Sequence, residues 1–266
     1  MKHAALAAGL FASAVAISAP ALAADMPLKA LPPGPVTYDW SGVYIGGLIG
    51  GGWSTDRFND SLGFLGGPLF LNQPIVQTVN GSGFIGGVEI GSNYQFGKLI
   101  IGWEADWTGG DIKGTNTASF ATLAGIPETR TISANTDWTA TVASRVGIAH
   151  NNWMLYGKAG TAFAHTNFTD NWTAFAAGAS VFAGTGSSNR VGWMTGTGLE
   201  WAFATSWSLK VEYDYLNFGS RADAVNGTLG AALAGAAFPG SIGVQNDLHI
   251  NQIKAGLNWR FMPNFW

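Results

Sequence analysis

The chain has 266 residues, of which 11% are charged, 38 are glycine and 12 are tryptophan, and its formal net charge is -3. Charged residues make up about a quarter of an ordinary soluble domain, so this composition is unlike that of a typical soluble enzyme. The small net charge argues against a nucleic-acid partner. The absence of cysteine excludes disulfides, thiol catalysis and thiolate metal sites. Beyond the N-terminus there is no apolar run of about 18 residues, which argues against a helical membrane protein.

Residues 1–23 have the features of a secretory signal peptide. Lys2 gives a basic start, an apolar run covers residues 4–17, and Ala21-Leu22-Ala23 forms a small-x-small cleavage site. A membrane anchor is the alternative for the same stretch. Residues 24–39 are rich in proline, which predicts an extended linker. We expect residues 40–266 to form one domain.

From Trp40 onward the sequence alternates with period two, as strands do, because successive strand side chains point to opposite faces. In the clearest stretch, residues 190–218, one face carries large apolar groups such as Leu199 and Val211. The other face carries mainly glycine, alanine and charges, Glu200 among them. This arrangement is typical of a strand with lipid outside and a polar lumen inside. The predicted strands cover residues 42–53, 83–96, 99–109, 138–149, 153–165, 190–203, 207–218 and 249–261.

The connections between these strands alternate between short and long. Gly97-Lys98 has the form of a two-residue hairpin turn with glycine first, and residues 150–152 and 204–206 are similarly short. The other connections are roughly 24 to 31 residues long, as in barrels with short periplasmic turns and long external loops. The sequence therefore predicts an all-β fold, an eight-stranded antiparallel up-and-down transmembrane β-barrel in outer-membrane lipid, with both termini in the periplasm. An even strand number lets the last strand pair with the first, which removes free edges.

Charged side chains on the inward face are the candidate functional residues. An isolated charge in a narrow lumen is costly, so a nearly balanced set predicts a plug of paired side chains. A wet pore with solvated charges is the alternative. With a turn at residues 204–206, Phe203 lies opposite Trp207, Trp201 opposite Leu209, and Glu200 opposite Lys210. The predicted lumen charge network consists of Glu89, Glu104, Asp106, Arg145, Lys158, Glu200, Lys210, Glu212, Asp214, Lys254 and Arg260.

Other motifs give weaker signals. The glycine-rich residues 46–52 lack the Lys-Ser/Thr of a phosphate-binding loop, so we interpret them as small inward residues that make room in the lumen. His150, His165 and His249 fall in a turn or near loops, and a metal or catalytic site there would need loop geometry that the sequence does not specify. We therefore predict no catalytic residue, no metal ligand and no cofactor.

Five segments stand out in the predicted barrel: WSGVYIGG (40–47), GFIGG (83–87), RVGW (190–193), WSLKVEY (207–213) and AGLNWRF (255–261). Together they resemble the immunogenic, porin-like outer-membrane β-barrel proteins of alpha-proteobacteria, whose barrel is similar to the membrane domain of OmpA. Two departures stand out. The family usually has a second inward arginine where this chain has Ala143, and it usually ends on the closing aromatic where this chain adds residues 262–266 after Phe261.

The resemblance implies a surface antigen whose terminal aromatic, Phe261 or Trp266, is read by the outer-membrane assembly machinery. Together with the residues, it predicts a non-enzymatic, structural and surface-exposed protein with a plugged polar lumen. A narrow porin for small hydrophilic solutes is the alternative. A lipid-modifying barrel enzyme would need a Ser or His constellation at the membrane interface, and the sequence has none with defined spacing. The sequence does not predict the oligomeric state.

Overall fold

The computed structural model describes residues 38–60, 75–121, 127–174, 179–230 and 238–261. The predicted signal peptide, residues 24–37 of the predicted linker and residues 262–266 lie outside this described part, so they remain predictions. Within it, no helix is long and apolar enough to cross a membrane.

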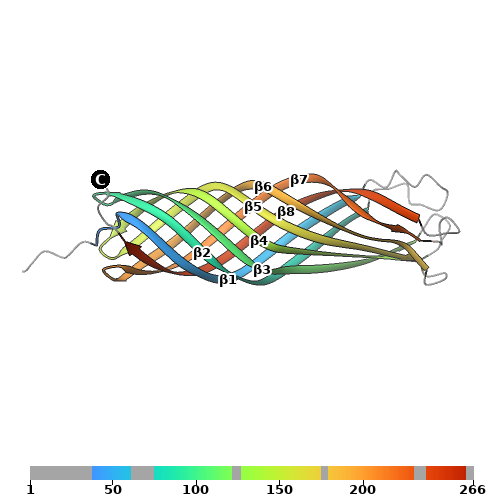
Figure 1. Cartoon of the computed structure of the whole chain (residues 1–266), viewed down its shortest axis with the longest axis horizontal. Helices are drawn as coiled ribbons and strands as arrows, with labels where there is room; N and C mark the ends of the chain where they lie inside the picture. Colours follow the sequence, from blue (N-terminus) through green and yellow to red (C-terminus); the bar gives the residue numbers. More distant parts are fainter. Residues whose placement is uncertain (1–37, 61–74, 122–126, 175–178, 231–237, 262–266) are drawn as a thin grey trace, which may run out of the picture. The chain divides into compact units, whose positions relative to one another are not determined.

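Eight strands form one closed sheet (Figure 1). Each pairs antiparallel with the next in the chain, and β8 pairs with β1. The predicted fold class is therefore confirmed. The strands are β1 (Gly42–Asp60), β2 (Ile75–Phe96), β3 (Leu99–Ala121), β4 (Pro127–His150), β5 (Trp153–Ala174), β6 (Ala179–Ala204), β7 (Trp207–Leu229) and β8 (Phe238–Phe261).

The strands are longer than the sequence pattern predicted. They have from 19 residues in β1 to 26 in β6, whereas about 9–11 residues are enough to cross a bilayer. Most residues that we assigned to long loops therefore continue the strands. On β4, for example, the outward positions from Asn135 to Thr129 carry amides and hydroxyls. Outward side chains beyond the lipid need not be apolar, so the apolar alternation stops while the backbone ladder continues.

Three tight turns lie together at one end of the barrel, which we call the turn end; the opposite end is the loop end. Gly97 begins the first turn with a φ of 61°, as predicted for glycine there, and Asn151 of the second has a φ of 54°. Our expectation that Phe203 faces Trp207 was wrong. Ala204 faces Trp207 instead, because Phe203 is an extra residue that makes a bulge in β6.

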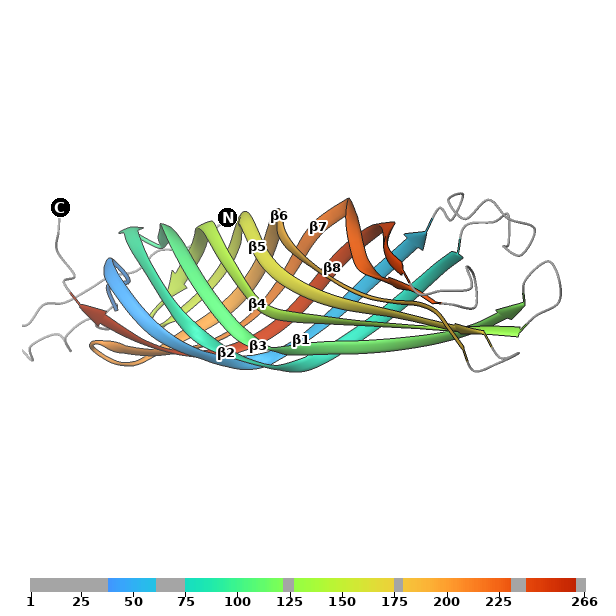
Figure 2. The same cartoon turned by 45° about the vertical axis from the view of Figure 1, so that its right-hand side comes forward.

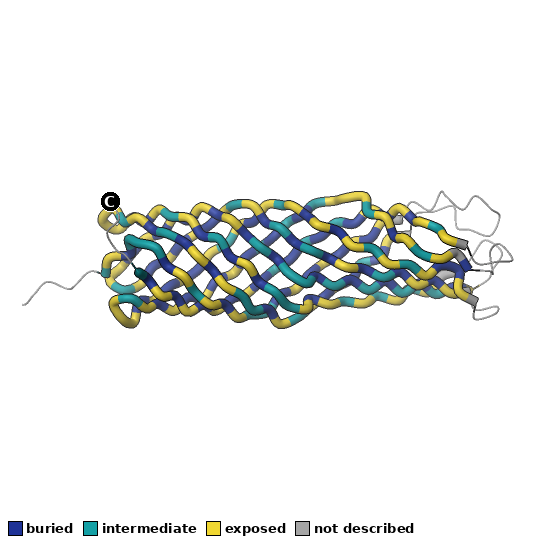
Figure 3. Tube along the Cα trace, viewed as in Figure 1, coloured by how far each residue is buried: buried dark blue, intermediate teal, exposed yellow. Residues whose placement is uncertain are grey.

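An apolar belt surrounds the turn-end half of the barrel. Residues alternate between exposed and buried along each strand (Figure 3). The predicted outward residues of this half, such as Ile49, Phe84 and Val211, are the exposed ones, and their glycine-rich or charged neighbours point inward. Tryptophans lie near both edges of the belt, with Trp153 and Trp259 toward the turns and Trp53 and Trp193 on the other side. This is the outer face that a bilayer requires.

The interior is filled by alternating apolar and polar layers. A turn-end cluster contains Trp40, Ile100, Ala149, Met154, Tyr156 and Ala202. The predicted charged residues form the next layer toward the loop end. Beyond them lies a middle cluster of Ile85, Ile112, Ala143, Ala162, Ala164, Met194, Leu216, Phe218, Leu248 and Ile250. A loop-end cluster contains Phe58, Val79, Ile132, Ala134, Phe168, Trp172, Val181, Phe182, Val225, Ile242 and Val244.

The loop-end half of the barrel is divided by two seams. Pairing between β2 and β3 stops at Ser82 and Lys113, and pairing between β6 and β7 is interrupted between Thr185 and Trp193. Figure 2 shows β2 and β3 diverging toward the loop end. The seams lie four strands apart, and β6 and β7 pair again from Phe182 to Thr185, so the sheet of this half is interrupted along the two seams without being separated into two sheets. The loop-end cluster fills the interior of this half with side chains from β1, β2 and β4 to β8.

Candidate functional site: the charged lumen

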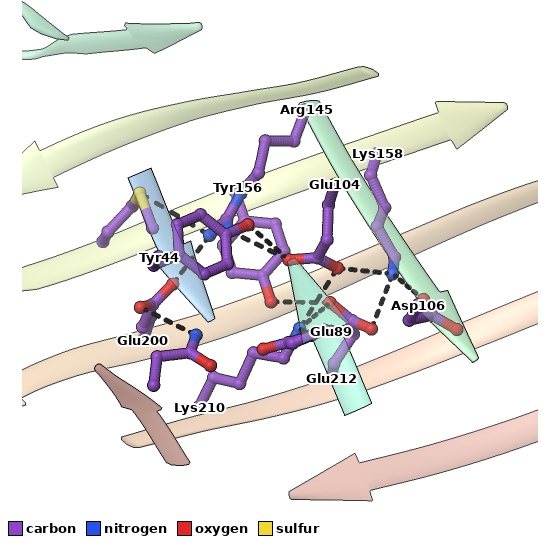
Figure 4. A network of polar contacts seen from close by, with 12 residues as sticks. Tyr44, Glu89, Glu104, Asp106, Arg145, Tyr156, Lys158, Glu200, Lys210 and Glu212 are labelled. Carbon is purple, nitrogen blue, oxygen red and sulfur yellow. Dashed lines mark hydrogen bonds and ion pairs between the residues drawn. The ribbon is translucent and has the colours of Figure 1, made fainter. Parts of the chain in front are cut away.

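All eleven residues of the predicted lumen charge network have side chains inside the barrel, and none is more than 5% exposed. They come from seven of the eight strands because inward positions alternate along each one. Ion pairs link all eleven into one connected set in the turn-end half, most of which is visible in Figure 4. The set has six carboxylates and five cations, so its charges nearly cancel.

Arg145 on β4 lies at the turn-end side of this network. Its guanidinium nitrogens lie 3.1 Å from the Glu104 carboxylate and 2.7 Å from that of Glu200. Its Cζ is 3.8 Å from the ring centroid of Tyr156 and 5.5 Å from that of Tyr44. Cation–π contacts therefore add to the ion pairs, and both hold the guanidinium in the middle of the lumen.

Three lysines and Arg260 are the other cations of the network. Lys158 Nζ lies 2.9 Å from Glu104 and 2.7 Å from Glu212. Lys254 Nζ lies 3.1 Å from Glu212 and 2.6 Å from Asp214. Each carboxylate except Glu89 is thus shared by two or more cations, and each ammonium by two or more carboxylates. This sharing compensates for the cost of removing the charges from water.

Lys210 corrects one sequence-based expectation. It lies opposite Glu200 in the register of β6 and β7, as predicted, but the two do not form an ion pair in the structure. Lys210 extends across the lumen to Glu89 on β2 and to Glu104, 3.1 Å away. Glu200 binds Arg145 instead. Long side chains in a narrow lumen reach the far wall, so the neighbour in register need not be the partner.

Two tyrosines belong to the network although we did not predict them. Tyr44 Oη donates to Glu104 at 2.7 Å and Tyr156 Oη donates to Glu212 at 2.7 Å. Each faces an inward glycine on the neighbouring strand, Gly91 and Gly198, where a Cβ would come within 2.3 Å of the tyrosine oxygen. An inward glycine opposite an inward tyrosine is the sequence signal that identifies such lumen-crossing rings.

The residues just before β1 close the turn end. Trp40 is wholly buried in the turn-end cluster, and its backbone N–H donates to Gln95 Oε1 at 2.7 Å. Arg260 lies over the rings of Trp40 and Tyr38, with its Cζ 4.8 and 5.1 Å from their centroids. Tyr38 Oη also donates to the Thr205 carbonyl at 3.1 Å. We had placed Tyr38 in the linker, and the structure packs it against the barrel mouth.

The network does not have the character of a metal centre. Carboxylate oxygens of Glu104, Asp106 and Glu212 lie within 4.8 Å of one another, a spacing that a cation can use. The ammonium groups of Lys158 and Lys254 already bind oxygens of this group, so its negative charge is compensated from within the protein.

The structure does not bring the three histidines of the barrel together. His150 ends β4 at the turn end, whereas His165 on β5 and His249 on β8 lie beyond the belt. His165 Nδ1 lies 2.7 Å from Asn189 Oδ1, and His249 Nδ1 lies 3.0 Å from Tyr215 Oη. In the described part of the chain His165 and His249 have local partners, and the three histidines form no common cluster.

A closed antiparallel barrel with an apolar belt and a charged interior defines an outer-membrane β-barrel protein. The model of the outer membrane protein beta-barrel domain matches residues 9–261, and the chain belongs to this family. It is 29% identical over 233 residues to the 31 kDa outer-membrane immunogenic protein of Brucella melitensis biotype 1, and equally to that of Brucella suis biovar 1, with 85% of both chains covered. The resemblance to the immunogenic barrels of alpha-proteobacteria is thereby confirmed.

Solved structures with a similar fold include two other outer-membrane barrels. The outer membrane protease OmpT of Escherichia coli has a TM-score of 0.48 and 8% identity, covering 85% of this chain and 99% of that one. The outer membrane protein OprG of Pseudomonas aeruginosa has a TM-score of 0.40 and 14% identity, covering 84% of this chain and 99% of that one.

Proposed function

We propose that this protein is a non-enzymatic outer-membrane barrel with a closed lumen, which presents a rigid β-rod at the cell surface. The observation that carries the proposal is the lumen charge network, packed between Trp40 at the turn end and the middle cluster. An eight-stranded barrel is only wide enough for side chains to fill. Here large side chains cross the lumen and bind its far wall, so a continuous path for water would require several ion pairs to break.

The proposed orientation places the turn end in the periplasm and the loop end outside the cell. Short turns on the periplasmic side and longer external loops are the rule for such barrels. Export through the predicted signal peptide and insertion by the outer-membrane assembly machinery belong to the same proposal. The rod would then extend beyond the outer leaflet, because the strands continue past the apolar belt.

Single-cysteine labelling tests this orientation, and the native chain has no cysteine to interfere. Thr117 is exposed in the loop-end half and Lys98 is exposed in a tight turn. A membrane-impermeant maleimide should label Thr117→Cys in intact cells, and should label Lys98→Cys only after the outer membrane is opened. The reverse labelling pattern would contradict the orientation, and equal labelling of both would contradict outer-membrane insertion.

Solute uptake tests the closed lumen against the narrow porin. Liposomes that contain the purified protein should swell in arabinose no faster than protein-free liposomes. Removing the ring of Trp40 and the charge of Arg145 together should increase the swelling rate if these groups block the path. Rapid swelling with the unchanged protein would favour the porin.

A further inference from the structure

A hollow lies on the outer face of the rod where β6 and β7 separate. The β6–β7 ladder ends at Thr185 and Asn226 and does not resume until Trp193 and Asn217. The hollow has a volume of about 560 Å³, within the roughly 300–1,000 Å³ of small-molecule sites. Its lining residues are Asn167, Phe168, Thr169, Thr185, Gly186, Ser187, Ala224 and Asn226.

Gly186 forms the floor of this hollow. A Cβ at this position would lie 2.2 Å from the Phe168 ring and 2.9 Å from the Ala224 carbonyl oxygen. Any larger residue would therefore clash with this buried ring or force the strands apart. The buried edge of Phe168 closes the floor from inside, so the hollow does not continue into the lumen.

The lining is polar but carries no charge. Amide groups come from Asn226 and from Asn167, whose Nδ2 also donates to Asp137 Oδ2. Hydroxyls come from Thr169, Thr185 and Ser187. The interrupted ladder also leaves residues 186–192 of β6 without ladder partners on β7. The hollow thus offers hydrogen-bond donors and acceptors on both sides.

Charges do occur further down the same seam, but they bind one another. The carboxylate of Asp223 accepts from Ser188 Oγ at 2.8 Å and from the Arg190 guanidinium. Arg221 Nε lies 3.7 Å from Asp223, and Arg221 Nη1 donates to the Asn189 carbonyl at 2.8 Å. None of these charged residues belongs to the lining of the hollow, which is neutral.

These features restrict the class of ligand. An acidic ligand would have no cation in the lining to pair with, and an apolar one would leave the amides and hydroxyls unpaired. Binding sites for proteins are typically rich in exposed aromatic and arginine side chains, and the lining of the hollow has no exposed side chain of either kind. A compact, uncharged molecule with many hydroxyls matches the lining best.

We propose that this hollow binds a neutral saccharide. The site itself does not depend on orientation, but its access to sugars outside the cell rests on the proposed function. Two sources have the same chemistry: free oligosaccharides, and uncharged sugar units of the polysaccharide that surrounds the rod in the outer leaflet.

The test uses the full-length, isotope-labelled protein refolded in detergent micelles. A panel of neutral trisaccharides is titrated while the backbone amide signals of Gly186, Ser187 and Ala224 are followed by NMR, with an acidic trisaccharide for comparison. At least one neutral sugar should shift these signals. Asn226→Ala combined with Thr185→Val should weaken this binding about tenfold, because two hydrogen bonds are lost.

Asn171→Ala is the matched control, since Asn171 is an exposed outward amide on the same face but outside the hollow. It should leave the affinity unchanged. Lipopolysaccharide with and without its polysaccharide chain then separates the two sources, since only the long form should compete if the surrounding polysaccharide is the ligand.

The proposal is overturned if no neutral sugar shifts the three amides, if Asn171→Ala weakens binding as much as the double variant, or if only the acidic sugar binds. None of these outcomes bears on the closed lumen or the orientation, which the swelling and labelling experiments test separately.

Discussion

Arg145 and Lys158 lie directly opposite each other on β4 and β5, and both bind the carboxylate of Glu104. Like charges facing across strands normally destabilise a sheet. Here a shared anion from β3 separates them, at 3.1 Å from the guanidinium and 2.9 Å from the ammonium. The barrel therefore depends on ion pairs inside its lumen as well as on its backbone ladder.

Glu104→Gln should strongly destabilise the barrel. The substitution removes the charge that holds three cations, Arg145, Lys158 and Lys210, and breaking a buried pair typically costs about 3–5 kcal/mol. Urea unfolding in lipid vesicles, followed by heat-modifiable gel mobility, measures the loss. The control is Asp111→Asn, which disrupts the exposed Lys113–Asp111 pair and should leave the midpoint unchanged. Equal midpoints for the Glu104 variant and the wild type would show that the network is solvated.

A double-mutant cycle should separate register from contact at Glu200. The coupling free energy between Glu200→Gln and Arg145→Met should be about 1–3 kcal/mol, because these groups are 2.7 Å apart in the lumen. The coupling between Glu200→Gln and Lys210→Met should be smaller, within about 0.5 kcal/mol, because Lys210 binds other carboxylates. A larger coupling for the Lys210 cycle would restore the pair that the register alone suggests.

The sequence pattern was sufficient to predict eight strands and their two faces, because lipid demands apolar groups at alternate positions. Leu199 and Val211 illustrate this, since both are exposed and face each other across β6 and β7. The pattern did not predict how far the strands extend. Beyond the belt the outward positions become threonine, serine and asparagine, which occur equally in loops, and only the backbone ladder distinguishes the two.

The sequence predicted which charged residues lie in the lumen, but not which of them bind each other. Alternation places a charge such as Lys210 on the inward face, yet its partner is chosen by reach across the lumen, which depends on barrel diameter and strand stagger. Trp40 was missed as a lumen residue for a related reason. It precedes β1, so the alternation of strand side chains does not predict which way its side chain points. Gly42, with a φ of 123°, turns the chain inward there.

Arginine substitutions on the outer face should distinguish the apolar belt from the loop-end half of the barrel. Val211→Arg should cost about 2–4 kcal/mol, the price of placing a cation against the bilayer midplane. Thr131→Arg is the matched control, because Thr131 is outward on β4 in the loop-end half and should change stability by less than about 0.5 kcal/mol. The same unfolding assay measures both. Similar losses at the two positions would contradict the placement of the belt.

Asp56 should make stability depend on pH. It lies on β1 beyond the belt and is 1% exposed, and burial raises the pKa of its carboxyl from 3.8 to about 6. The folded state therefore favours the protonated form. This contribution to stability is complete below pH 3.8 and is lost as the pH rises to about 6.

Asp56→Asn mimics the protonated form and should remove this pH dependence. Above pH 6 the variant should be more stable than the wild type, by an amount on the order of 3 kcal/mol, and below pH 4 the two should be similar. Unfolding midpoints measured from pH 4 to pH 8 provide the comparison. If the wild type instead became more stable relative to Asp56→Asn as the pH rises, the assigned direction of the pKa shift would be contradicted.

The closed lumen is tested most directly by single-channel recording in planar bilayers. With the lumen charge network packed above Trp40, the purified wild-type protein should insert without steady conductance at moderate voltage. Glu104→Gln, if it still folds, should produce brief, irregular openings as the released cations move. Regular, porin-like conductance steps from the wild-type protein would show that water and ions pass the network, and would contradict the account.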